Sequence, residues 1–378
     1  MLSFADLSPY LPWLLPLPAL LALALSTVNL AFWPRGRPGF HKTTSVSVCI
    51  PARNEEVGIE ACVTAALALG ADEVIVVDDG SSDDTAAILA RLAVGRAELR
   101  VVRLDAALPT GWVGKARACR LLSALAHGEH LMFIDADVVV DKGALGRFDE
   151  LRRRYRADMI SGVPRQITIT FMERLVLPLL HVTYTSWLPL PLIWRTKNHR
   201  FLAANGQMLW LSRAALDDVG GFTAIRGEIV DDMALGRAMK RAGKRVLFVD
   251  GDALGTCRMY RSGQAVIDGF SKNLYEGLGS LPALVSIVGW YAWAFIVPYM
   301  LLPVFPIPAA VGVGAALAVR LLQAWRHHSS IVSAVLNPLG VLVLIWIAVR
   351  SWAWSRKGKI VWAGRVYGAR KGRMAQPG

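Results

Sequence analysis

The chain of 378 residues is 54% hydrophobic, carries a formal net charge of +13 and contains four cysteines, and its mean hydropathy is +0.40. This composition argues against an ordinary soluble enzyme and indicates contact with a membrane. The positive charge favours basic loops beside an anionic lipid leaflet over a nucleic-acid surface, so we expect no nucleic-acid partner. The cysteines lack C-x-x-C spacing, which predicts free, partly buried thiols.

An uncharged apolar run occupies residues 11–33. It is long enough to cross a hydrocarbon core of ~30 Å at ~1.5 Å per residue. Arg35, Arg37 and Lys42 follow it, whereas a cleaved signal peptide carries its positive charge before the apolar run. We therefore predict an uncleaved anchor in residues 1–34, with the N-terminus outside and the following residues in the cytoplasm.

Apolar runs alternate with helix-like stretches from residue 45 onward, as in a chain that folds into strands and covering helices. This alternation predicts right-handed crossovers and a mostly parallel sheet, and therefore an α/β fold. The expected strands are residues 45–50, 74–77, 98–104 and 130–137, and a helix is expected after Asn54.

Polar side chains follow three of these strands at the point where each strand ends. Ligands of parallel sheets bind beyond the carboxyl ends of the strands, so we expect the three clusters to meet at one rim. A solvated turn explains any one cluster, but crowded carboxylates at three strand ends indicate a bound cation or hydrogen-bond donors. The clusters are Arg53, Asn54 and Glu55, then Asp78 and Asp79, then Asp135 and Asp137.

Four motifs in this order resemble those of the family 2 glycosyltransferases with the GT-A fold. They are PARNEE (51–56), VDDGSSDDT (77–85), DAD (135–137) and VDDMALGRAMKRAG (230–243), and the resemblance covers residues 45–265. Three further segments are similar to the carotenoid-associated and hopanoid-associated members of that family. These are LPTGWVGKARAC (108–119), CRMYRSGQAVIDGFSKN (257–273) and VWAGRVYG (361–368).

The resemblance implies a nucleotide-sugar donor whose diphosphate is bound through Mg²⁺ or Mn²⁺. Such cations prefer carboxylate and phosphate oxygens, and residues two apart on an extended segment point the same way. Asp137 is expected to bind the metal, and Asp135 to support the metal or the ribose.

The remaining donor contacts are expected at both ends of the nucleotide. Pro51, Ala52 and Glu55 would lie against the base and ribose, and Asp78 or Asp79 would accept a hydrogen bond from a pyrimidine N–H, which uracil offers. Lys115 stands where a helix is expected to open and is predicted to bind phosphate, with a solvated surface lysine as the alternative. Arg258 and Arg261 are expected to bind the diphosphate or a lipid head group.

Inverting transfer requires a base that removes the proton of the acceptor. The resemblance assigns this role to the second carboxylate of the pair Asp231 and Asp232, where the family usually has Glu at the first position. A carboxylate at a helix start is also an ordinary capping choice. The Q-x-x-R-W motif of the processive members is missing, and this predicts transfer of a single sugar.

Residues 167–195 are apolar but interrupted by Glu173, His181 and prolines. One interpretation is buried core, and the other, which we prefer, is an interfacial segment that admits a lipid acceptor, with Trp187 at head-group level. Gly206, in ANGQMLWLS (203–211), would then line the acceptor side.

Apolar density returns in residues 281–319 and 331–349, within a predicted C-terminal membrane region of residues 281–354. The pattern is consistent with two or three spans. The basic tail, residues 355–378, is expected in the cytoplasm, and this requires an even number of C-terminal crossings.

These features predict an inverting, metal-dependent enzyme of the inner membrane. It would be multi-pass, with a cytoplasmic catalytic domain, and would move one sugar from a nucleotide sugar, expected to be a UDP-sugar, to an isoprenoid lipid such as a carotenoid or hopanoid. The alternatives are a polyprenyl-phosphate sugar synthase and a membrane scaffold that keeps the fold without turnover. A scaffold needs neither a metal nor a base.

Overall fold

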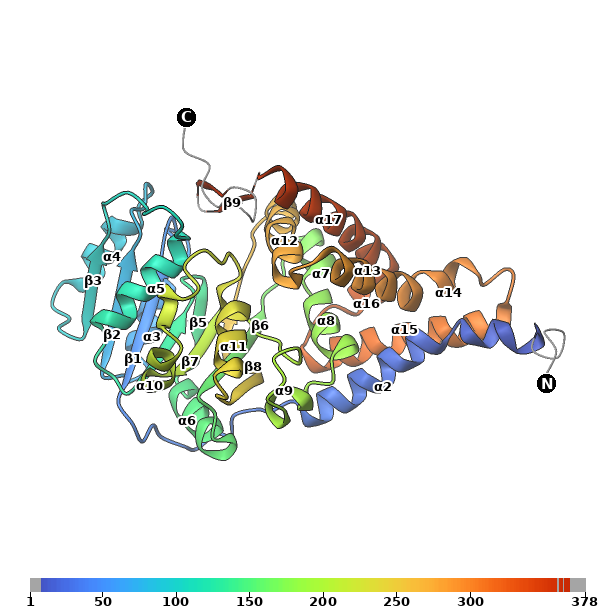
Figure 1. Cartoon of the computed structure of the whole chain (residues 1–378), viewed down its shortest axis with the longest axis horizontal. Coiled ribbons are helices and arrows are strands. Elements are labelled where there is room, and N and C mark those ends of the chain that lie inside the picture. Colours follow the sequence, from blue (N-terminus) through green and yellow to red (C-terminus); the bar gives the residue numbers. More distant parts are fainter. Residues whose placement is uncertain (1–7, 359, 363, 368–378) are drawn as a thin grey trace. The chain divides into compact units, whose positions relative to one another are not determined.

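The computed structural model describes residues 8–358, 360–362 and 364–367 of the chain, which divides into two compact units (Figure 1). The sheet unit comprises Trp33–Ile167, Pro191–Met259 and Val361–Gly378. The helical unit comprises Met1–Phe32, Thr168–Leu190 and Tyr260–Ile360. The segment Thr168–Leu190 therefore groups with the apolar helices, and the end of the chain groups with the sheet.

An eight-stranded sheet forms the centre of the sheet unit, in the order β3-β2-β1-β4-β7-β6-β8-β5. The pairs β1–β2, β2–β3 and β1–β4 are parallel, and this confirms the four strands and the parallel arrangement that the sequence predicts. β7 is antiparallel to both β4 and β6, while β6 and β8 run parallel and β5 is antiparallel to β8. The strands are β1 (Val46–Ala52), β2 (Glu73–Asp78), β3 (Leu99–Arg103), β4 (His130–Ile134), β5 (Val138–Val140), β6 (Met159–Gln166), β7 (Met208–Ser212) and β8 (Val246–Cys257).

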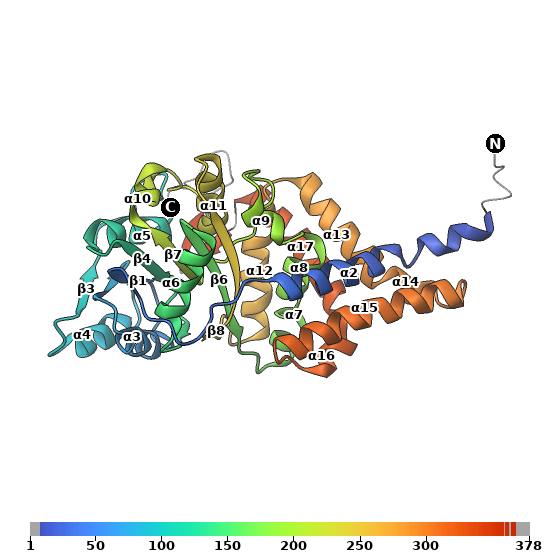
Figure 2. The same cartoon turned by 90° about the horizontal axis from the view of Figure 1, so that it is seen from below.

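Helices cover both faces of this sheet, with α3 and α4 on one side and α5, α10 and α11 on the other (Figure 2). The central strands are buried on both faces, which is why they read as continuous apolar runs in the sequence. Trp210 of β7 stacks on Phe148 of α6 at 5.6 Å between ring centroids within the core. The helices are α3 (Ile59–Leu67), α4 (Thr85–Ala93), α5 (Gly114–Leu125), α6 (Ala144–Tyr155), α9 (Pro191–Arg195), α10 (Arg213–Asp218), η2 (Gly221–Thr223) and α11 (Asp231–Arg241).

The described part of the helical unit contains three helices that are long and apolar enough to cross a membrane: Tyr10–Phe32, Pro306–Arg326 and Asn337–Lys357. A fourth candidate is the pair α12 and α13, which is bent by 117° at its break. The elements are η1 (Ser8–Leu14), α2 (Leu17–Phe32), α7 (Phe171–Val176), α8 (Leu179–Trp187), α12 (Gly263–Leu278), α13 (Leu281–Phe295), α14 (Val297–Met300), α15 (Pro306–Arg326), α16 (Ile331–Val335) and α17 (Asn337–Lys357).

The N-terminal candidate span coincides with the predicted anchor. The two long C-terminal helices, α15 and α17, would make an even number of crossings if both span the membrane, which is the parity expected for a cytoplasmic tail. If the bent pair α12 and α13 also crossed, the number would be odd. Residues 368–378 of the predicted basic tail lie outside the described residues.

Most of the predicted interfacial segment, Thr168–Leu190, packs within the helical unit, whereas residues 191–195 group with the sheet unit. Leu179 and Val182 of α8 are buried in one apolar cluster with Ala19 and Ala22 of α2. The Asn29 side chain donates to the Thr185 carbonyl at 2.6 Å, which fixes α8 against α2. The buried parts of α7 and α8 therefore have helices, rather than a core of strands, as their partners.

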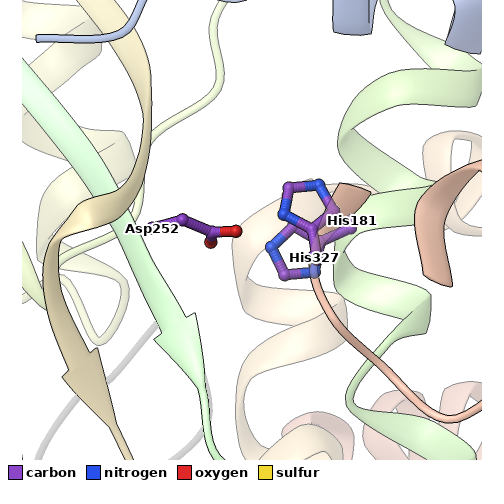
Figure 3. A group of neighbouring side chains, drawn as sticks. All are labelled: His181, Asp252 and His327. Atoms are coloured by element: carbon purple, nitrogen blue, oxygen red, sulfur yellow. The ribbon is translucent and has the colours of Figure 1, made fainter. Parts of the chain in front are cut away.

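Two buried histidines that sequence spacing left unassigned meet in this unit. The rings of His181 in α8 and His327, which follows α15, stack at 3.8 Å between centroids (Figure 3). Burial and the neighbouring His327 lower the pKa of His181 well below its usual range, which favours a neutral ring. Asp252, also labelled in Figure 3, belongs to β8 of the sheet unit.

Candidate functional site

The loops that follow β1 and β2 are joined by hydrogen bonds at the rim of the sheet. Asn54 adopts a left-handed backbone with φ 55°. Its N–H donates to the Ser81 hydroxyl at 2.9 Å, and its side-chain oxygen accepts from the Ser82 N–H at 2.8 Å. The Glu55 N–H donates to the Thr85 hydroxyl at 2.8 Å. Two of the predicted polar clusters therefore form one connected surface.

Pro51 and Ala52 are the last two residues of β1 and pair with Val77 and Asp78 of β2. Ala52 is buried and Pro51 is partly exposed. They therefore lie at the edge where the two joined loops begin.

Asp78 is 1% exposed, and both of its carboxylate oxygens are engaged. Oδ1 accepts from the Ser81 N–H at 2.9 Å and from the Ser81 hydroxyl at 2.5 Å. Oδ2 lies 3.2 Å from Nη1 of Arg103. Asp78 thus holds the loop together in this structure instead of facing an open site.

Asp79 is 2% exposed and lies between two guanidinium groups. Oδ2 pairs with Arg365, and Oδ1 is 3.4 Å from Nη2 of Arg117, without hydrogen-bond geometry. The contact of Asp78 or Asp79 with a donor base stays a prediction; Oδ1 of Asp79 has no hydrogen-bond partner among the described residues, whereas both oxygens of Asp78 are engaged.

A cluster of three carboxylates follows β1 and β4. Burial, Asp137 and Asp135 raise the pKa of Glu55 to about 8. Burial and Asp135 raise the pKa of Asp137 to about 6, although a hydrogen bond from the Cys257 thiol lowers it. The pKa values are raised in part because the ionised carboxylates repel each other. A cation bound among them would offset this repulsion.

The same cluster fits a divalent cation by its donor atoms. Oδ1 of Asp137 is enclosed and has no hydrogen-bond partner among the described residues. Asp135 is partly exposed and shares its Oδ1 with Lys115. Hard oxygen donors of this kind suit Mg²⁺ or Mn²⁺. The residues expected to bind metal are therefore compatible with one.

Lys115 stands in the first turn of α5, as the sequence predicts for the start of a helix. Its Nζ lies 2.7 Å from Oδ1 of Asp135 and 3.9 Å from Oδ1 of Asp231. Burial lowers the pKa of Lys115, but Asp135 and Asp231 raise it by more, so that the net shift is upward. The ammonium group is thus charged and largely enclosed, and it is not a solvated surface lysine.

Asp231 and Asp232 open α11 and are 6% and 8% exposed. Burial, followed by the charge of Asp231, raises the pKa of Asp232 to about 7. Oδ1 of Asp232 accepts from the Met233 N–H at 2.7 Å. A carboxyl group that titrates near neutrality is suited to taking up a proton during a reaction.

Gly206 lies between Lys115 and the acidic pair. A Cβ built at this position would be 3.2 Å from Nζ of Lys115, 3.5 Å from Cβ of Asp232 and 3.6 Å from Oδ1 of Asp231. The absence of a side chain at residue 206 therefore keeps open the space that these groups share.

The other predicted residues divide between the two units. Arg258 follows β8 in the sheet unit, whereas Arg261 lies in the helical unit. Trp187 ends α8 of the helical unit, is 40% exposed and makes an edge contact with Trp290 at 5.6 Å between centroids.

Four residues that contact the site, Gln207, Cys257, Arg365 and Tyr367, were not predicted as site residues from the sequence. The Gln207 amide donates to Sγ of Cys257 at 2.8 Å, and the Cys257 thiol in turn contacts Asp137. Arg365 and Tyr367 come from the last described strand. The sequence signal for that strand is the tail segment VWAGRVYG, whose likeness to the family predicts no role for its individual residues.

The chain is similar in sequence to known glycosyltransferases. Residues 47–220 match the family model described as Glycosyl transferase family 2. A protein of Staphylococcus aureus (strain MRSA252) named 4,4'-diaponeurosporenoate glycosyltransferase is 27% identical over 343 residues, which cover 86% of this chain and 89% of the relative. A protein of the same name from Staphylococcus haemolyticus (strain JCSC1435) is 28% identical over 243 residues and covers 63% of each chain.

A solved structure has a similar fold at lower identity. It is the mannosyltransferase PcManGT from Pyrobaculum calidifontis in complex with GDP-Man and Mn²⁺. The TM-score is 0.55 at 18% identity, and the match covers 89% of this chain and 99% of that chain. The expected architecture, an α/β sheet domain together with apolar helices, is therefore confirmed.

Proposed function

The chain is a glycosyltransferase with a family 2 domain of the GT-A fold, and from this premise we propose that it moves one sugar from a nucleotide sugar to an isoprenoid lipid of the membrane. A UDP-sugar is the proposed donor, and a carotenoid or hopanoid is the proposed acceptor. The names of the two staphylococcal relatives support a carotenoid-type acceptor, and the apolar helices support a lipid one.

One observation carries the catalytic part of this proposal. Lys115, Asp231 and Asp232 surround Gly206 beside Asp135, and the pKa of Asp232 is raised to about 7. Buried carboxylates close to each other lower the stability of a fold. Such groups are therefore found mainly where their charge serves a function. A scaffold that kept the fold without turnover would gain nothing from this arrangement.

We assign the roles as follows. Asp232 takes the proton of the acceptor, and Asp231 helps to hold Lys115. Lys115 faces the departing diphosphate. Asp137 and Asp135 would hold Mg²⁺ or Mn²⁺, which when bound supplies a Lewis acid that stabilises the leaving group. The sequence departs from the processive motif, so a single transfer is proposed.

The proposed setting is a multi-pass protein of the inner membrane with its catalytic domain in the cytoplasm, where nucleotide sugars are made. The basic residues that follow the first span support this orientation. The lipid acceptor would then reach the site from the bilayer.

The test is mass spectrometry of lipid extracts from cells with and without the gene. A carotenoid or hopanoid that gains the mass of one hexose only in the presence of the gene supports the proposal. A sugar on a polyprenyl phosphate would assign the chain to the synthases instead. An Asp137→Ala variant is the inactive control, and an Asp218→Asn variant, changed at an exposed ion pair with Lys244, is the matched active control.

A further inference from the structure

The C-terminal hairpin contacts the sheet unit at residues that are far from it in the sequence. It consists of β9 (Ile360–Trp362) and β10 (Arg365–Tyr367), and from Val361 onward it groups with the sheet unit. Arg365 reaches Asp79 over a separation of 286 residues, and Tyr367 reaches Gly114 over 253 residues. These contacts bring the end of the chain to the rim where the donor is expected.

The first contact places a guanidinium group on the outer side of Asp79. Nη1 of Arg365 pairs with Oδ2 of Asp79, and Nη2 donates to the Asp79 carbonyl at 3.3 Å. The side chain of Arg365 is 20% exposed, whereas that of Asp79 is 3% exposed. A guanidinium group carries five N–H donors, so the two bonds to Asp79 and a further one to the Tyr367 side chain leave it capable of binding another acceptor.

The second contact anchors the hairpin at the start of α5. The Tyr367 hydroxyl accepts a hydrogen bond from the Gly114 N–H at 3.2 Å. Gly114 is the first residue of α5 and precedes Lys115. β10 therefore extends from the carboxyl end of β2 to the lysine assigned to the diphosphate.

The charges around Asp79 do not balance. Among the described residues, the guanidinium groups of Arg117 and Arg365 lie against this carboxylate, and Arg53 donates to the Asp79 backbone carbonyl. The neighbouring Asp78 is opposed by a fourth, Arg103. Burial and the charge of Arg365 lower the pKa of Arg53, so these cations repel each other. The two guanidinium groups at the Asp79 carboxylate exceed its single negative charge, so this rim attracts an anion such as the diphosphate of a nucleotide sugar.

We propose that the C-terminal hairpin completes the donor-binding site and that Arg365 binds the diphosphate of the nucleotide sugar. This rests on the proposed function, because it presupposes that donor. Asp79 then serves to orient Arg365, and Tyr367 fixes the strand that carries it.

The dimensions agree with this placement. β2, β1 and β4 are consecutive in the sheet, so the ends of β2 and β4 are separated by two strand spacings, on the order of 10 Å. A diphosphate with one cationic side chain on either side of it spans such a distance. The diphosphate of a donor at this rim would then lie between Arg365 on one side and Lys115 on the other, because Tyr367 of the same strand contacts both Arg365 and the start of α5.

The experiment measures binding to the purified full-length chain by calorimetry. The probes are UDP, GDP, uridine and guanosine, and the variants are Arg365→Ala and Arg365→Lys. Arg91→Ala is the matched control, because Arg91 forms an exposed pair with Glu60 in the same unit. We expect Arg365→Ala to weaken binding of the diphosphate by ~10- to 100-fold, since a hydrogen bond to a charged group contributes about this much. The nucleoside should change by less than about twofold, because it carries no phosphate.

Each other outcome has a distinct meaning. Equal loss for diphosphate and nucleoside would make Arg365 merely structural and overturn the inference. Tighter binding of UDP in Arg365→Ala would also overturn it, since the hairpin would then compete with the donor. A wild-type chain that binds no nucleoside diphosphate overturns the proposed function together with the inference. If Arg365→Ala fails to fold, Arg365→Lys decides, because it keeps the charge beside Asp79 but loses the two-pronged contact; unchanged diphosphate affinity in that variant would refute the role of Arg365.

Discussion

Replacing Asp232 by Asn tests the assignment of the catalytic base. The change removes the ionisable group and keeps the size of the side chain and its acceptor for the Met233 N–H, at 2.7 Å in the wild type. Donor binding should remain nearly intact, because the metal ligands and the arginines lie on other elements. Transfer at saturating donor should fall by ~10² to 10⁴, which is the usual contribution of a positioned proton acceptor.

The raised pKa of Asp232 also predicts how the activity of the wild type depends on pH. Burial and Asp231 raise the pKa of Asp232 from 3.8 to about 7. A base acts only when it is ionised, so activity should rise with pH through this value and be nearly complete about one unit above it. At one unit below it, on the order of a tenth of the groups are ionised, and the rate should fall about tenfold for each further unit.

The assay follows transfer of radiolabelled sugar to extracted lipid between roughly pH 5 and pH 9. The wild type should show the acidic limb, and the residual activity of Asp232→Asn should lack it. Asp218→Asn should retain the wild-type profile, because Asp218 is exposed. The reasoning would be refuted if Asp232→Asn kept the wild-type rate and limb, or if it lost donor binding but transferred normally at saturation. The base would then lie elsewhere, with Asp231 and Glu228 as the next candidates, or the acceptor would already be ionised.

Three further predictions concern the metal ligand Asp137, the space beside Gly206 and the membrane topology. Asp137→Ala should abolish transfer and weaken donor binding without lowering the melting temperature, because its enclosed oxygen is assigned to a cation; full turnover in excess EDTA would contradict this. Gly206→Ala should lower transfer by ~10-fold, because its methyl group would lie 3.2 Å from Nζ of Lys115 and displace it; a wild-type rate would show that Lys115 adapts freely. Protease added outside intact spheroplasts should spare residues 45–265, and digestion of this domain there would reverse the proposed orientation.

The amino-acid sequence by itself determined the local elements and the class of site. Alternating apolar runs predicted β1 to β4, because buried parallel strands must be apolar on both faces. The clusters at Glu55, Asp79 and Asp137 could be placed on one rim because parallel strands carry their carboxyl ends to the same edge. The anchor and the apolar C-terminal helices followed from length and hydropathy alone.

The tertiary structure decided which of these groups contact each other. The sequence showed that Asp78 and Asp79 lie at a strand end, but only the fold showed that Ser81 and arginines already engage them. It also placed the Cys257 thiol against Asp137, although Cys257 lies at the far end of β8.

The approach of Arg365 to Asp79 is the clearest case, since 286 residues separate them. Periodicity reports which face of a helix or strand is buried, and it acts over a few residues. A contact between distant residues leaves no such pattern in one sequence, because it depends on how strands and helices pack. The segment VWAGRVYG could therefore be recognised as a family motif from the sequence. The contact of its Arg365 with Asp79 was visible only in the folded structure.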